Sequence, residues 1–145
     1  MLFKKSTEYA IKVLSLMAKD SQKQFFGTKE LAESIQVSVT YLAKILQKLQ
    51  HAGFVKSITG PGGGFSLAKD AKSIQLIDII KTLENEELFT SCALGMSECG
   101  TGNPCPLHEK WALFREDIKK YLENISVSDT AEDFWPAYNR MPPPL

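Results

Sequence analysis

Apolar side chains recur at helical spacing along the first half of the chain. Over about residues 4–19 they stand at positions i, i+3, i+4 and i+7, which is one face of an amphipathic helix. The same spacing returns between Ser38, a suitable N-cap, and Gly53, which suits the left-handed residue that ends a helix. Just before it, Thr28 is a suitable N-cap for a short helix through Ile35. Two helices joined by so short a turn are typical of a helix-turn-helix motif.

The next segment changes from helical spacing to two short strands around a glycine-rich turn. Residues 54–58 and 65–68 flank Thr59-Gly-Pro-Gly-Gly-Gly, which predicts a β-hairpin. A nucleotide-binding phosphate loop is excluded, because no Gly-Lys-Ser/Thr follows and the next element is a strand. Helix, helix-turn-helix and hairpin in this order predict a winged helix. The expected fold class is therefore mainly α with a small β-wing.

The second half of the chain predicts two more long elements and an irregular segment. An amphipathic helix follows Ser73, residues 91–104 are irregular and glycine-rich, and Pro106 suits the first turn of a helix to about Asn124. A heptad repeat along that helix predicts a coiled-coil seam with the same helix of a second copy. The alternative is that this face packs inside the monomer. The repeat comprises Leu107, Trp111, Phe114, Ile118, Tyr121 and Ile125.

The formal net charge of zero hides an asymmetry between the two halves. Residues 1–72 contain 11 Lys and Arg against 5 Asp and Glu, whereas residues 73–145 contain 6 against 12. A basic half of this kind favours a polyanionic partner, although scattered surface charge is the alternative.

The winged helix and the basic half together predict binding to a double-stranded DNA operator. The second helix of a helix-turn-helix enters the major groove, where hydroxyls and amides read base edges and lysines attract phosphates. The alternative is a merely solvated helix face. That face also carries Gln47 and His51; His51, beside Gly53 at the helix end, suits a cap or packing role rather than metal ligation. The glycine-rich tip lets backbone approach a groove wall. The candidate DNA-binding residues are Ser38, Thr40, Tyr41, Lys44, Lys48, Thr59, Gly60 and Gly62.

Composition excludes several other classes of protein. The chain has 145 residues, of which 43% are hydrophobic and 23% charged, as expected for a packed globular protein. No apolar run approaches the roughly 20 residues of a membrane span, and charges at Lys4, Lys5, Glu8 and Lys12 argue against a signal peptide. We therefore expect a cytoplasmic protein that does not contact a membrane. With two histidines and no catalytic constellation around a cysteine, we expect no enzyme and no organic substrate.

Three cysteines lie in or directly after the irregular segment, and their spacing suits a metal site. Cys92, Cys99 and Cys105 are separated by six and five residues, without the Cys-x-x-Cys pair of structural zinc sites. Thiolates spread along a loop can hold an iron–sulfur cluster, and Cys105-Pro106 repeats a pairing of ferredoxin-type loops. His108, three residues after Cys105, is a candidate fourth ligand. Spacing alone leaves open an iron–sulfur cluster, or zinc and redox-active thiols.

Several motifs together resemble one known family. They are Ser6-Thr-Glu-Tyr-Ala10, Tyr41-Leu42, Gly60-Pro-Gly-Gly-Gly-Phe65 and the three cysteines. Over about residues 1–125 the chain resembles the Rrf2 family of bacterial winged-helix transcription regulators. The resemblance implies a homodimer joined through the long helix and a 2Fe–2S or 4Fe–4S cluster, with 2Fe–2S favoured. It also implies a regulator, expected to be a repressor, that senses nitric oxide, redox state or iron–sulfur status.

The resemblance leaves two choices for the fourth cluster ligand. One branch of the family uses a histidine placed like His108, and another uses an acidic residue of the partner subunit, at a position that matches Glu8. The chain carries both residues, and its complete Cys-x-x-His spacing favours His108. One departure concerns DNA, because relatives often carry an arginine where this chain has Thr59.

These interpretations divide the chain into three parts. Residues 1–72 are the expected winged helix-turn-helix, and residues 73–125 the cluster-binding loop and dimerisation helix. Residues 126–145 are a C-terminal extension with one short helix, in which Asp129 and Glu132 form a pair like a capping box. The alternative function is a winged-helix regulator or protein-binding module whose cysteine loop holds zinc or redox thiols and no iron–sulfur cluster.

Overall fold

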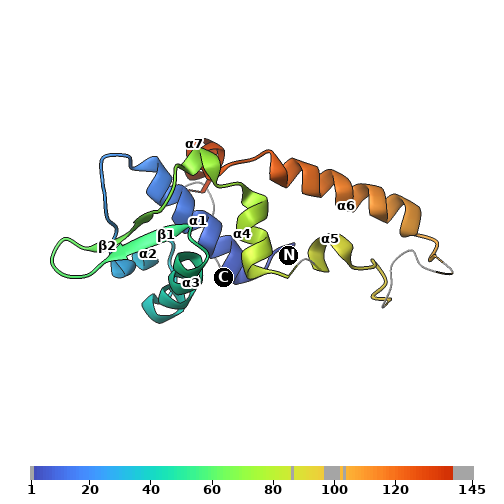
Figure 1. Cartoon of the computed structure of the whole chain (residues 1–145), viewed down its shortest axis with the longest axis horizontal. Coiled ribbons are helices and arrows are strands. Elements are labelled where there is room, and N and C mark those ends of the chain that lie inside the picture. Colours follow the sequence, from blue (N-terminus) through green and yellow to red (C-terminus); the bar gives the residue numbers. More distant parts are fainter. Residues whose placement is uncertain (1, 86, 97–101, 103, 139–145) are drawn as a thin grey trace.

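A computed structural model describes residues 2–85, 87–96, 102 and 104–138, with backbone alone for residues 133–138. Figure 1 shows a lobe of packed helices with a two-stranded wing at one end. On the side away from the wing, α6 extends from the lobe with α5 beside it. No helix in this described part of the chain is long and apolar enough to cross a membrane. The elements in chain order are α1 (Lys5–Lys19), α2 (Thr28–Ser34), α3 (Val39–His51), β1 (Val55–Ile58), β2 (Gly64–Leu67), the 3₁₀ helix η1 (Ala71–Ser73), α4 (Leu76–Leu83), α5 (Glu87–Thr90), α6 (His108–Glu123) and α7 (Val127–Tyr138).

The helix-turn-helix consists of α2 and α3, as the sequence predicts. Ser38 caps α3, since its Oγ accepts a hydrogen bond from the Tyr41 backbone N–H at 3.2 Å. After α3, Gly53 takes the predicted left-handed conformation with φ +84°. The prediction that Thr28 caps α2 is wrong by one residue, because Gly27 is the N-cap and Thr28 the first helical residue.

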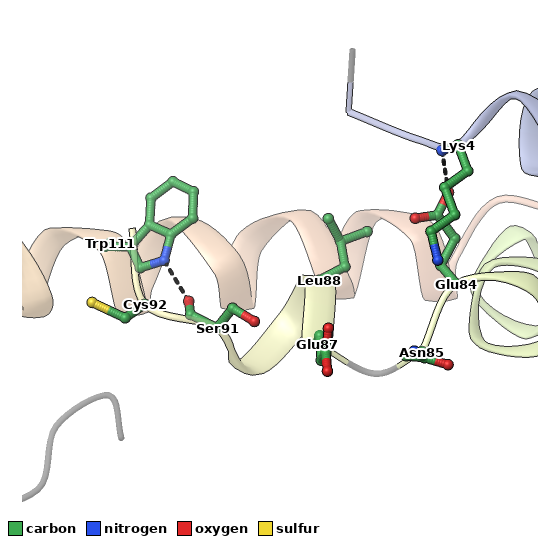
Figure 2. Close-up of a pocket in the computed structure, with 8 residues that line it drawn as sticks. All are labelled: Lys4, Glu84, Asn85, Glu87, Leu88, Ser91, Cys92 and Trp111. Atoms are coloured by element: carbon green, nitrogen blue, oxygen red, sulfur yellow. Dashed lines mark hydrogen bonds between the residues drawn. The ribbon is translucent and has the colours of Figure 1, made fainter. Parts of the chain in front are cut away.

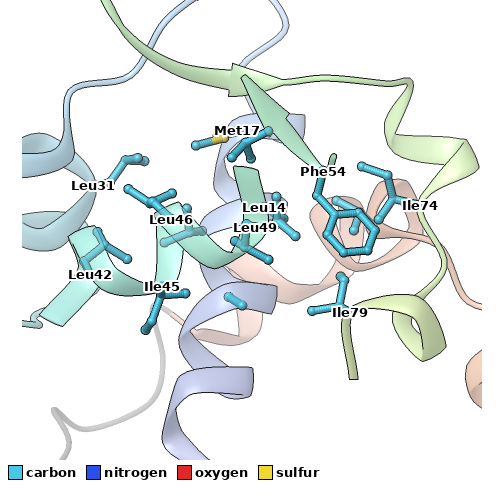
Figure 3. Close-up of a cluster of buried hydrophobic side chains, with 14 of the residues drawn as sticks. Leu14, Met17, Leu31, Leu42, Ile45, Leu46, Leu49, Phe54, Ile74 and Ile79 are labelled. Carbon is cyan, nitrogen blue, oxygen red and sulfur yellow. The ribbon is translucent and has the colours of Figure 1, made fainter. Parts of the chain in front are cut away.

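The core of the lobe lies where α1, α2, α3 and α4 meet (Figure 3). The predicted apolar stripes of α1 and α3 are buried there, each with a relative exposure of 4% or less. Burying such side chains is the main favourable term in folding and leaves the polar side of α3 in solvent. The stripe residues are Ala10, Val13, Leu14 and Met17 of α1 and Leu42, Ile45, Leu46 and Leu49 of α3.

The wing is tied to the chain before α2. β1 and β2 pair antiparallel from Val55 opposite Leu67 to Ile58 opposite Gly64. Phe26 exchanges two backbone hydrogen bonds with Phe65 of β2, both of 2.8 Å. This bridge holds the chain extended up to Gly27, which explains why α2 starts after that residue.

The long helix begins two residues later than predicted and its heptad repeat is divided. Residues 105–108 form a turn, with the His108 N–H donating to the Cys105 carbonyl at 3.0 Å, and α6 starts at His108. Trp111, Ile118 and Ile125 are half-buried within the monomer, as the packing alternative predicts. The other three positions are exposed: Leu107 (50%), Phe114 (53%) and Tyr121 (66%). The monomer thus leaves one apolar stripe of α6 uncovered.

The helix after α6 joins the same core and has a different cap from the predicted one. The capping box pairs Ser126 with Asp129: Asp129 Oδ2 accepts from the Ser126 N–H and Oγ, both at 2.8 Å, and Ser126 Oγ accepts from the Asp129 N–H. The prediction of an Asp129–Glu132 pair is therefore wrong. The hydrogen bonds from Ser126 lower the pKa of Asp129. α7 packs on α1, where Ser15 Oγ and Thr130 Oγ1 lie 2.7 Å apart.

Candidate nucleic-acid interface and cysteine loop

The polar side of α3 faces solvent along the whole helix. Thr40, Tyr41, Lys44 and Lys48 are all exposed, because the apolar stripe of the same helix is turned into the core. The helix is also attached to the wing, since Gln50 Nε2 donates to Ser57 Oγ at 3.0 Å. Hydroxyl and ammonium groups are thereby presented on one rigid surface, which is the arrangement that base edges and phosphates require.

An aromatic contact joins α1 to the start of α3. The rings of Tyr9 and Tyr41 meet edge to face with centroids 6.0 Å apart, and Lys12 Nζ lies 5.5 Å from the Tyr9 centroid. Partial burial lowers the pKa of Lys12, and the charge of Glu8 opposes this shift. Sequence reasoning missed this cluster, because nothing in the spacing of α1 indicates which part of α3 it touches.

The tip of the wing has the backbone that its glycines predict. Thr59, Gly60 and Gly62 are exposed, and Gly60 and Gly62 have φ values of +96° and +73°. A Cβ added at either glycine would meet no atom within 4 Å. These positions therefore leave a bare strip of backbone at the tip, which suits close approach to a groove wall.

Gly64 is constrained more tightly than the tip glycines, and we predict that Gly64→Ala destabilises the fold. Its φ is +142°, and a Cβ there would lie 2.3 Å from the Phe26 carbonyl oxygen. The bridge between Phe26 and Phe65 must then open. Gly64→Ala is expected to lower the free energy of unfolding by about 3 kcal/mol, from backbone strain and lost hydrogen bonds.

Gly62→Ala is the matched control for this prediction, because it adds the same methyl group into open space. Its conformational cost alone should be about 1 kcal/mol. Urea unfolding followed by circular dichroism measures both. Equal losses of stability in the two variants would contradict the steric argument.

Cys92 is held against α6 by its neighbour. The Ser91 carbonyl accepts hydrogen bonds from Trp111 Nε1 at 2.9 Å and from an Arg115 guanidinium nitrogen at 2.6 Å. Figure 2 shows Ser91, Cys92 and Trp111 together at one end of a pocket of about 250 Å³, with Lys4 at the other end. Cys92 itself is 8% exposed, and the Leu94 N–H points to its Sγ at 3.4 Å.

The second described thiol and the imidazole lie at the start of α6. Cys105 and His108 are half-buried and share the turn that opens the helix. Trp111 stands three residues further, or about 4.5 Å along the helix axis. Because Trp111 binds the carbonyl next to Cys92, both ends of the cysteine segment are attached to the first turns of the same helix.

The residues present fit an iron–sulfur cluster by their chemistry. Thiolates are the usual protein ligands of such clusters, and backbone N–H groups directed at sulfur, as Leu94 directs its own, stabilise them. Cys99 lies outside the described residues. Within the described ranges, no three His, Cys, Asp or Glu side chains are already grouped as a metal site.

Glu8, the alternative ligand, lies on α1 and away from the cysteine segment in sequence. Its Oε2 is 3.3 Å from Lys5 Nζ, and its side chain is half-buried. One turn earlier, the Lys4 backbone N–H donates to Glu84 Oε1 at 2.5 Å, which places the start of α1 beside the pocket that Cys92 also lines.

The fold and the exposed polar side of α3 define a winged-helix DNA-binding protein. Residues 3–133 match the Rrf2 family, described as iron-dependent transcriptional regulators, and the chain belongs to that family. It is a transcriptional regulator and not an enzyme.

Relatives agree with this assignment. The chain is 31% identical over 125 residues to the HTH-type transcriptional regulator IscR of Vibrio campbellii, covering 86% of this chain and 74% of that protein. Among solved structures it is similar to CymR, the global cysteine regulator of Bacillus subtilis, with a TM-score of 0.75 and 25% identity over 90% of this chain and 95% of that one. The fold is also that of T. potens IscR, with a TM-score of 0.74 and 24% identity over 96% and 90% of the two chains.

Proposed function

We propose that this regulator is a homodimeric repressor whose affinity for a double-stranded DNA operator is controlled by an iron–sulfur cluster. Cys92, Cys99 and Cys105 hold the cluster, with His108 as the fourth ligand and 2Fe–2S as the favoured type. In this proposal residues 1–72 bind the operator, and residues 73–125 hold the cluster and form the dimer.

The attachment of the cysteine segment to α6 is the observation that carries the proposal. Trp111 and Arg115 bind the carbonyl beside Cys92, and Cys105 shares a turn with His108 at the start of the same helix. A bound cluster supplies a group that nitric oxide or oxygen destroys and that iron shortage removes. When the cluster is lost, the cysteine side chains no longer share a ligand, and only backbone contacts attach the segment to α6. The loss of the cluster therefore changes the restraints on α6.

The placement of His108 supports it as the fourth ligand. It shares with Cys105 the turn that opens α6, whereas Glu8 lies on α1, and in the family branch with an acidic ligand that residue comes from the partner subunit. Replacement of His108 therefore acts within one chain, and replacement of Glu8 acts across the dimer. Dimers that combine one wild-type and one variant subunit therefore distinguish His108 from Glu8 as the fourth ligand.

The dimer forms through the uncovered stripe of α6. Leu107, Phe114 and Tyr121 repeat every seven residues, as one side of a helix pair does. Two recognition helices joined in this way address half-sites about one helical turn, or roughly 34 Å, apart. A shift of α6 alters their spacing, so one state fits the operator better than the other.

A second candidate function is a regulator without a cluster, in which the cysteine segment holds zinc or acts through redox thiols. The similarity of the fold to the cysteine regulator CymR supports it. The winged helix and its DNA-binding face are common to both candidates.

The visible absorption spectrum of anaerobically purified protein tests the proposal, with iron, sulfide and zinc assayed on the same sample. Brown protein with matched iron and sulfide is expected, and their stoichiometry distinguishes 2Fe–2S from 4Fe–4S. Colourless protein that contains zinc, or no metal after anaerobic reconstitution with iron and sulfide, would favour the second candidate.

A further inference from the structure

A groove runs beside the recognition helix, between the second half of α3 and the end of α4. It has a volume of about 520 Å³. α3 and α4 contact each other through their buried sides, so the groove lies on the outer edge of a packed interface. The described residues that line it are Lys44, Gln47, Lys48, His51 and Ala52 of α3 and Thr82 of α4.

The α3 wall of the groove carries a row of groups that bind phosphate. Lys44, Lys48 and His51 stand at positions i, i+4 and i+7, and all are exposed. Seven residues of α-helix span about 10 Å. A row of this length is long enough to reach more than one phosphate of a DNA strand. The described lining residues include no carboxylate; the exposed Asp78 stands one turn before Thr82 on α4.

The α4 wall is rigid and presents a small polar side chain. Ile79 and Ile80 are fully buried and fix the helix in the core, while Thr82 is exposed. Thr82 Oγ1 donates to the Asp78 carbonyl at 2.8 Å, which keeps the side chain close to its own helix and the groove open. Lys81, also exposed, adds a positive charge to the same last turn.

We infer that this groove seats one phosphate strand of bound DNA, with His51 and Thr82 as further DNA-binding residues. Lys44 and Lys48 belong both to the base-reading side of α3 and to the groove, so the strand continues from the recognition surface without a break. α4 is thereby part of the DNA interface, although it lies outside the helix-turn-helix and the wing. The inference rests on the DNA-binding class of the protein and is independent of the cluster.

Introducing a negative charge into the α4 wall tests the inference. Thr82→Glu in the full chain is expected to weaken binding to a random-sequence duplex, and to a duplex that the wild type selects from a random pool, by about tenfold each. The losses should be equal, because phosphates carry no sequence information. Thr82→Lys is expected to strengthen binding to both duplexes. This variant tests the inference independently if Thr82→Glu does not fold.

Asn124→Glu is the matched control. Asn124, like Thr82, is exposed at a helix end and donates to the carbonyl four residues earlier, but it lies at the end of α6. It should leave both affinities unchanged. The inference fails if Thr82→Glu binds both duplexes as the wild type does, if Asn124→Glu loses as much, or if only the selected duplex is affected. A wild type that binds neither duplex overturns DNA binding itself, which is a different result.

Discussion

Protein in which Cys92, Cys99 and Cys105 are all replaced by alanine is expected to be colourless and free of iron after anaerobic purification. Alanine offers no thiolate, and one imidazole does not hold a cluster. The loss should extend to regulation. In the wild type, operator affinity should differ between the loaded and cluster-free forms by about 5- to 150-fold, the usual range of allosteric coupling. In the triple variant that difference should vanish.

Fluorescence anisotropy with a wild-type-selected duplex, before and after nitric oxide, measures this coupling. Ser91→Ala is the control, because its contacts to Trp111 and Arg115 use the backbone carbonyl and survive the substitution. It should remain brown and responsive. A triple variant whose affinity still responds to nitric oxide would show that the signal enters elsewhere. An iron-containing triple variant would refute the ligand assignment.

Phe114→Glu combined with Tyr121→Glu is expected to convert the protein from a dimer into a monomer of 16.2 kDa. Both side chains lie on the uncovered stripe of α6, and a dimer would bury about 150–250 Å² for each aromatic residue. Four carboxylates in a paired stripe would have to lose their hydration, which is costly. Operator affinity should fall about 100-fold or more, because two linked recognition helices gain by effective concentration.

Lys120→Glu is the charge-matched control for this double variant. It changes the net charge by the same two units, and the side chain of Lys120 is exposed, with its Nζ 3.8 Å from Glu116 Oε1. Light scattering should find it dimeric. Tyr121→Glu alone is a second test, since Phe114 also contacts Trp111 within the monomer, with ring centroids 5.7 Å apart. Dimers that persist in the double variant would place the interface on another surface.

The local elements follow from the sequence because their causes are local. The α1 and α3 stripes at i, i+3, i+4 and i+7 are buried as predicted, since a helix with one apolar face must bury it. Ser38 and Gly53 take their predicted places at the ends of α3, because a cap depends on one side chain and the nearest backbone groups.

The sequence-based predictions are wrong where a residue distant in the sequence contacts the segment. Phe65 pairs with Phe26 and moves the start of α2, although 39 positions separate the two residues. The heptad of α6 predicts one seam, but α4 and α5 cover half of it and leave the rest exposed. Spacing describes a face of a helix and does not state how much of that face the same chain covers.

The candidate site likewise has features that follow from local sequence and features that depend on tertiary contacts. By itself, the sequence determined the winged helix and the exposed polar side of α3, because each depends on residue type and spacing within one segment; the cysteine ligand set stays a prediction of that spacing. Only the tertiary structure decided that Trp111 and Arg115 donate to the Ser91 carbonyl, that the rings of Tyr9 and Tyr41 meet, and that Thr82 and Lys48 line one groove. These contacts join separate elements, and the packing of α4 and α6 around a shared core sets them rather than any local pattern.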